Sequence, residues 1–198
     1  MKIALSGSGS TGKTTLAEEI GKRFGIPVIG EYARETATNM GIQDLRGLNP
    51  DQAYDFQWRI LERKLAEEDK HDTFIADRSV ADNIAYYLRW CSRDIDDERN
   101  KVYVDRCQER LHYYDHIMVL PPGVIPLEND GFRSSKIYYQ YEIHCSILGI
   151  LTDNKIGWVA LNEPELESRI TILRSFFGDT IYEFSLGLDN ESDNPRMF

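Results

Sequence analysis

A short run of small residues near the N-terminus constrains this chain more than any other feature. Residues 7–10 (GSGS) follow the apolar run 3–5 (IAL), which predicts a short buried strand. The residues after them place Leu16, Ala17 and Ile20 on one face of a predicted helix. The run itself has too little side-chain bulk to build a core. The functional groups of this run must therefore be those of its backbone, which forms a tight turn between a strand and a helix.

This turn fits the spacing G-x-x-x-x-G-K-[ST], in which glycines permit backbone angles that a Cβ would resist. Small residues let several N–H groups converge on phosphate oxygens, and the helix N-terminus adds partial positive charge there. Lys13 would bring a full charge to the terminal phosphates of ATP, and the Thr14 hydroxyl would ligate Mg²⁺. The predicted nucleotide-binding residues are Gly7, Ser8, Gly9, Ser10, Thr11, Gly12, Lys13, Thr14 and Thr15.

The rest of the chain alternates short apolar runs with helical patterns. Strands are predicted at 2–6, 27–30, 73–77, 115–120 and 156–161, all continuous enough to be buried on both faces. Among the helices, one spans about 50–70, with Asn49 as its N-cap and Pro50 in its first turn. This alternation favours an α/β domain with a mostly parallel sheet.

Composition narrows the class of protein. The 198 residues, 41% of them hydrophobic, suit one domain over 1–198, with a lid at about 124–140 and a tail that frays over 187–198. No apolar run reaches the roughly 20 residues that a membrane span needs. Three dispersed cysteines argue against disulfides or structural zinc, so a cytoplasmic protein is expected. A net charge of −10 without basic clusters disfavours binding to nucleic acid or anionic lipid, although a local basic channel stays open.

An acidic residue ends the third predicted strand. Asp77 is placed to hold Mg²⁺, directly or through water, beside the bound phosphates. The alternative is that Asp77 caps the helix that begins almost at once. Ser79 could cap that helix instead, which would leave Asp77 for the metal. The predicted metal ligands are thus Thr14 and Asp77.

On these residues the chain resembles the P-loop nucleoside and nucleotide kinases, above all the ATPase/kinase group with ribosylnicotinamide kinase domains. It is also similar to thymidylate kinases and deoxynucleoside kinases, over most of its first 150 residues. The resemblance implies a three-layer α/β/α fold with a five-stranded parallel sheet in the order 2-3-1-4-5 and a small lid. It implies transfer of the γ-phosphoryl group of ATP to a nucleoside or nucleoside monophosphate, with a thymidylate-like or ribosylnicotinamide-like acceptor.

The resemblance also assigns roles to charged residues. Arg78, next to Asp77, would approach the transferring or acceptor phosphate, and Arg133 in the lid segment 130–133 (DGFR) would neutralise charge on the γ-phosphoryl group. Glu31 would accept the proton of the acceptor hydroxyl, a task that suits a carboxylate, and Arg34 would contact an acceptor phosphate. For Glu31 and Arg34, an exposed helix N-terminus explains the residues equally well.

The long helix carries the last candidate residues. Phe56 and Gln57 are similar to a Phe-Gln pair of deoxynucleoside kinases, in which the amide pairs with the base edge; core packing is the alternative. Two other functions stay open, namely a kinase acting on a modified base of the 5-hydroxymethyluracil type within DNA, and a P-loop ATPase or switch without an acceptor. The sequence also leaves open whether the chain forms a homodimer.

Overall fold

The computed structural model describes residues 1–126 and 136–178. Five parallel strands form one sheet in the order β2-β3-β1-β4-β5, which confirms the predicted order. Leu5 pairs with both Asp77 and Met118, so β1 occupies the centre of the sheet. The strands are β1 (Lys2–Ser6), β2 (Val28–Ile29), β3 (Phe74–Asp77), β4 (His116–Val119) and β5 (Val159–Ala160).

Helices follow or precede each strand within the described part of the chain. The clearest sequence prediction, the helix at about 50–70, appears as α3 (Pro50–Glu68). The segment 33–39 forms a short helix, so Glu31 and Arg34 lie at a helix N-terminus, which the sequence analysis gave as an alternative for these two residues. The remaining helices are α1 (Lys13–Phe24), α2 (Ala33–Asn39), α4 (Val80–Trp90), α5 (Asp97–Leu111), α6 (Ile137–Asp153) and α7 (Leu166–Phe177), with 3₁₀ turns at Leu45–Gly47 and Ser92–Asp94.

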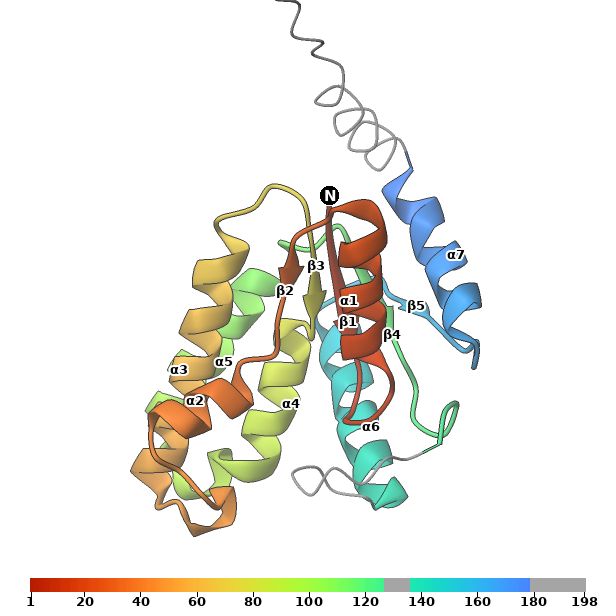
Figure 1. Cartoon of the computed structure of the whole chain (residues 1–198). Helices are drawn as coiled ribbons and strands as arrows, with labels where there is room; N and C mark the ends of the chain where they lie inside the picture. Colours follow the sequence, from red (N-terminus) through yellow and green to blue (C-terminus); the bar gives the residue numbers. More distant parts are fainter. Residues whose placement is uncertain (127–135, 179–198) are drawn as a thin grey trace, which may run out of the picture.

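Alternating residues of the strands build two hydrophobic cores. In β1, Ala4 faces the core shared with α3, α4, α5 and α6, whereas Ile3 and Leu5 face the core shared with α1 and α7. The same alternation holds in β3, where Phe74 and Ile75 face opposite cores. The three-layer α/β/α arrangement follows from this, with α1 and α7 against one face of the sheet and α3, α4, α5 and α6 against the other; Figure 1 shows α1 in front of β1.

Local signals in the sequence set the ends of the two helices that border the site. Asn49 and Gln52 form a reciprocal capping box at the start of α3, as the sequence predicted for Asn49. Ser79 caps α4 and accepts a hydrogen bond from the backbone N–H of Ala81. Asp77 is therefore not the cap, and its side chain is left for other contacts.

Several sequence predictions fall partly or wholly outside the described residues. Residues 127–135 of the predicted lid, with Arg133, and the predicted tail at 187–198 lie outside them, while 137–140 of the lid segment form the first turn of α6. Within residues 1–126 and 136–178, no helix has both the length and the apolar content that crossing a membrane requires.

Candidate active site

The loop between β1 and α1 has the backbone that its composition predicted. Gly7, Ser10 and Gly12 all have positive φ, at 147°, 57° and 83°. A Cβ on Gly7 would lie 2.5 Å from the carbonyl oxygen of Leu120, so only glycine fits there. The N-terminus of α1 opens directly after Gly12, which leaves its first N–H groups to bind an anion.

Lys13 is buried within this loop. Its Nζ donates to the carbonyl oxygen of Ser8 at 2.6 Å and to the hydroxyl of Thr11 at 3.1 Å. Burial and the nearby charge of Arg78 lower the pKa of Lys13 from 10.5 to about 8, against the opposing pull of neighbouring carboxylates led by Asp77. The amine is thus held close to where the terminal phosphates of a nucleotide would bind.

A second helix reaches the loop from the far side. Arg169 of α7 is buried and donates from Nη1 to the carbonyl oxygen of Thr11 at 2.9 Å. In a trans peptide the next N–H points the opposite way, so this bond turns the Gly12 N–H away from Arg169. Sequence reasoning missed Arg169, because its partner lies 158 positions away along the chain.

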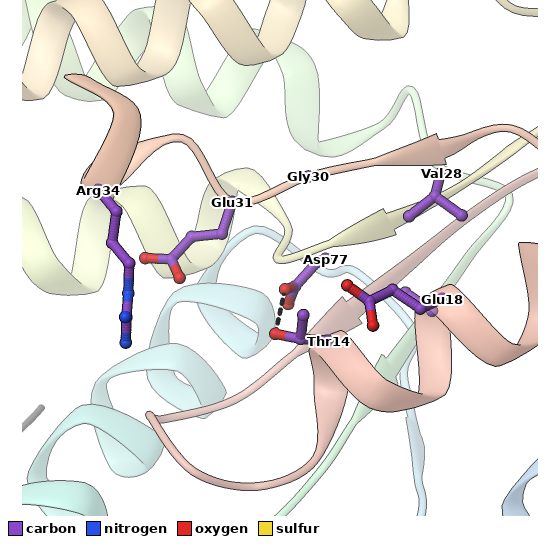
Figure 2. Close-up of a pocket in the computed structure, with 8 residues that line it drawn as sticks. Thr14, Glu18, Val28, Gly30, Glu31, Arg34 and Asp77 are labelled. Atoms are coloured by element: carbon purple, nitrogen blue, oxygen red, sulfur yellow. Dashed lines mark hydrogen bonds between the residues drawn. The ribbon is translucent and has the colours of Figure 1, made fainter. Parts of the chain in front are cut away.

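The two predicted metal ligands meet. The Thr14 hydroxyl donates to Oδ2 of Asp77 at 2.5 Å, and Figure 2 shows this bond beside Glu31 and Glu18. Asp77 is buried at the end of β3, and Thr14 is exposed in the first turn of α1. Hydroxyl and carboxylate oxygens are the ligands that Mg²⁺ prefers, so the donor set fits this ion.

Arg78 and Glu31 also lie together. Arg78 Nε is 3.6 Å from Oε1 of Glu31, and both side chains are largely buried. The Arg78 backbone has a φ of 90°, an uncommon conformation for a residue with a Cβ. Burial would lower the pKa of Arg78, but Tyr86, Glu31, Asp82 and Asp77 together raise it well above its ordinary value. The guanidinium therefore stays charged.

Asp82 connects these parts and was missed by sequence reasoning. This fully buried carboxylate accepts hydrogen bonds from the Gly7 N–H at 3.0 Å, the Ser79 N–H at 3.1 Å and Arg78 Nη1 at 3.3 Å, and from the Ser6 hydroxyl. It thus joins the phosphate loop to the start of α4. The S-x-x-D spacing of Ser79 and Asp82, typical of a capping box, is the signal that could have found it.

A buried ion pair contacts the backbone of Arg78. Lys64 of α3 donates to the carbonyl oxygen of Arg78 at 2.7 Å and pairs with Glu68 at 2.9 Å. Glu68 is fully buried and also accepts from Arg110 Nε at 2.9 Å and from the Tyr114 hydroxyl at 2.8 Å. This network holds the Arg78 peptide in its positive-φ conformation. From sequence alone, Lys64 and Glu68 have the spacing of an ordinary surface pair.

Two cavities open beside these residues and share Glu31. The smaller, of about 460 Å³, is lined by Thr14, Glu31, Arg34 and Asp77, and Figure 2 shows Glu31 and Arg34 pointing into the same space. The larger, of about 920 Å³, reaches from Gly9 of the loop past Arg78 to Phe56 and Gln57 of α3. Both predicted base-binding residues line this cavity, where Phe56 is buried and Gln57 is half-buried.

Some candidate residues do not join this group. Among the described residues no set of three or more His, Cys, Asp or Glu side chains could hold a metal ion. Thr15 is exposed and lines neither of the two cavities. Trp58 packs edge-on against Tyr103, with ring centroids 5.3 Å apart, as core residues do.

The sheet order and the phosphate loop define a P-loop protein with the fold of nucleoside and nucleotide kinases. A family model described as an AAA domain matches residues 2–169, and the chain belongs to this family. No curated protein sequence matches the chain.

Solved structures of similar fold agree with this class. Deoxyadenosine kinase from M. mycoides with bound dATP is 16% identical, with a TM-score of 0.60 and coverage of 89% of this chain and 99% of that one. NadR in complex with NR is 20% identical, with a TM-score of 0.64, and the match covers 89% of this chain but only 51% of NadR. Thymidylate kinase from Candida albicans is 20% identical, with a TM-score of 0.55 and coverage of 90% and 91%. At these identities the likeness concerns the fold.

Proposed function

We propose that this chain is a phosphotransferase that moves the γ-phosphoryl group of ATP to a hydroxyl group of a nucleoside. The observation that carries the proposal is the Glu31–Arg78 pair, 3.6 Å apart, at the junction of the two cavities. A carboxylate there is suited to accept the proton of an attacking hydroxyl, and a permanent cation beside it is suited to stabilise the transferring group.

The donor half of the proposed site is the phosphate loop. Its N–H groups and Lys13 would bind the β- and γ-phosphates, as the positive-φ backbone and the buried amine support. Thr14 and Asp77 would hold Mg²⁺, which neutralises charge on the phosphate oxygens when it is bound. The protein's own residues mainly position the reactants, because phosphoryl transfer needs little covalent chemistry from the enzyme.

The acceptor half is the larger cavity. Among the described residues its lining contains four cationic side chains (Arg46, Arg78, Arg89 and Lys136) and four anionic ones (Glu31, Asp44, Asp82 and Glu142), so their formal charge balances. Arg46 pairs with Asp44, Arg78 with Asp82, and Arg89 with Glu142. This balance suits an uncharged nucleoside, with Phe56 against its ring and Gln57 toward its base edge.

A nucleoside monophosphate is the second candidate acceptor. Arg34 favours it, because this exposed cation lines the smaller cavity beside Glu31. The printed names of the similar structures include a deoxynucleoside kinase, a thymidylate kinase and a protein bound to NR, which supports testing nucleosides, monophosphates and ribosylnicotinamide together.

The test is transfer from labelled ATP·Mg²⁺ to a panel of nucleosides, nucleoside monophosphates, nicotinamide riboside and DNA containing 5-hydroxymethyluracil, with a reaction that lacks any acceptor. We expect product only with free nucleosides, and a drop in kcat of about 100-fold or more in Glu31→Gln. Glu18→Gln, in the same small cavity, is the control and should keep its rate within about threefold. Equal ATP turnover without acceptor would point to an ATPase and overturn the proposal, and product only with DNA would select the base kinase.

A further inference from the structure

Gln140 in the first turn of α6 is a buried polar residue that the proposed chemistry does not use. Its side chain is 1% exposed, yet neither its amide nitrogen nor its amide oxygen has a hydrogen-bond partner among the described residues. Buried amides in folded proteins are nearly always bonded, and an unpaired one destabilises the fold. A ligand in the adjoining cavity would supply the partner that the described residues lack.

The position of Gln140 on its helix shows that an apolar residue would pack there. The buried stripe of α6 that faces α4 consists of Ile143, Ile147 and Leu151, and Gln140 continues the same stripe by one turn. That extra turn reaches the larger cavity, which Gln140 lines together with Gln57 of α3. The buried stripe of α6 therefore changes from apolar side chains to an amide side chain at the point where the core ends and the cavity begins.

The chemistry of the amide defines its ligand. Nε2 donates and Oε1 accepts, side by side and in one plane, so the matching group carries an acceptor next to a donor. Every nucleobase has such an edge, as does a primary carboxamide on an aromatic ring. Aromatic side chains in the same cavity, Tyr86 and the buried Phe56 among them, supply apolar surface for a flat ring.

We infer that Gln140 is a second specificity-determining residue of the acceptor site, which reads the donor–acceptor edge of a planar ring from α6. The inference rests on the proposed function, because it assumes that the larger cavity holds the acceptor. It adds to that function the recognition of the ring by two amides on two different helices. An acceptor whose edge is blocked by alkyl groups would leave Gln140 unpaired and bind weakly.

Calorimetric binding in the absence of ATP tests this inference separately from phosphoryl transfer. The probes are three matched pairs: deoxyadenosine and its N6,N6-dimethyl analogue, thymidine and its N3-methyl analogue, and nicotinamide riboside and its N,N-dimethylcarboxamide analogue. The wild-type chain should bind the unblocked member of at least one pair roughly tenfold to a hundredfold more tightly. Gln140→Leu should bind the unblocked member more weakly and lose most of this preference, the remainder being the part that Gln57 reads, and Gln140→Met should repeat this result if the leucine variant fails to fold.

Thermal unfolding separates this role from a structural one. Because the leucine removes two unpaired buried groups, Gln140→Leu should melt about 2–6 °C higher than the wild type while its binding is lost. Gln108→Leu, on α5 and away from both cavities, is the matched control and should leave the preference intact. A variant that is destabilised and keeps the full wild-type preference for the unblocked probe would overturn the inference.

The outcomes also distinguish this inference from the proposed function. If nucleosides bind with the expected discrimination but ATP·Mg²⁺ gives no product, the kinase proposal fails and the role of Gln140 stands. If nucleosides are phosphorylated and Gln140→Leu retains the full wild-type discrimination, the kinase stands and the role of Gln140 is overturned. A wild-type chain that binds none of the probes refutes the role of Gln140.

Discussion

At the scale of single residues, the site contains a buried charge and a strained backbone that both lower the stability of the empty protein. Lys13 is a buried amine whose pKa is lowered to about 8, and Arg78 is a buried guanidinium on a backbone with a φ of 90°. Both are conformations and environments that a chain selected only for stability would avoid. A bound phosphate would give Lys13 an anionic ligand and would give Arg78 a further one beside Glu31 and Asp82, so both residues are suited to a phosphate ligand.

The pKa of Lys13 gives a prediction about stability and pH. Between about pH 8 and 10.5 the unfolded chain holds a proton on Lys13 that the folded chain does not, so the free energy of unfolding should rise with pH in this window. Below pH 8 the buried charged amine lowers the free energy of unfolding by its full amount, which is roughly 3 kcal/mol at 1.36 kcal/mol per pKa unit. Lys13→Met should abolish transfer, remove this rise, and stabilise the protein at pH 7 by about 1–2 kcal/mol after loss of the bond to Ser8.

Urea unfolding at a series of pH values measures this difference. Lys22→Met on the exposed end of the same helix is the control and should follow the wild-type curve. An unchanged slope between pH 8 and 10.5 in Lys13→Met would show that the amine is not buried as described.

At the scale of secondary-structure elements, α3 does more than cover the sheet. Lys64 on this helix holds the carbonyl of Arg78, while Phe56 and Gln57 two turns earlier line the larger cavity. One helix therefore sets both the backbone of the proposed transition-state residue and the wall of the acceptor pocket.

This arrangement predicts unequal effects for neighbouring substitutions. Lys64→Met breaks a buried pair and frees the Arg78 carbonyl, so we expect a loss of about 2–4 kcal/mol in the free energy of unfolding and a lower kcat. Arg63→Met breaks an exposed i,i+4 pair with Glu67 and should cost less than about 1 kcal/mol. Urea unfolding and steady-state rates of both variants check this, and equal losses would contradict the role of Lys64.

The same elements show how far sequence alone could reach. The phosphate loop, the five strands and the caps Asn49 and Ser79 depend on neighbours in sequence, and these were predictable from spacing. The sheet order came from the resemblance to P-loop kinases, since spacing does not encode it. Lys64, Asp82, Gln140 and Arg169 were missed because their meaning depends on burial and on partners or cavities that only the folded chain brings to them.

At the scale of the whole molecule, the ligand proposals predict a thermal shift. A ligand at about 100 times its Kd adds about 2.7 kcal/mol of stability, which for a chain of this size is about 5–10 °C in Tm. We expect this shift with ATP and Mg²⁺ and a clearly smaller one when EDTA removes the metal. Asp77→Asn, which alters the proposed metal site but keeps the strand, should show the small shift in both conditions.

Differential scanning fluorimetry gives this result directly. The same full shift in the presence of EDTA would remove the metal from the proposal while leaving nucleotide binding in place. The absence of any shift with ATP would reject the phosphate loop as a binding site.

The buried carboxylate of Asp82 has an energetic consequence for the two halves of the site. It accepts from the Gly7 N–H on the donor side and from Arg78 on the acceptor side, with no intervening residue. Occupation of one half that alters its bond to Asp82 must alter the other bond as well. The two affinities are then linked, and reciprocity requires that ATP change the affinity for the acceptor by the same factor as the acceptor changes that for ATP.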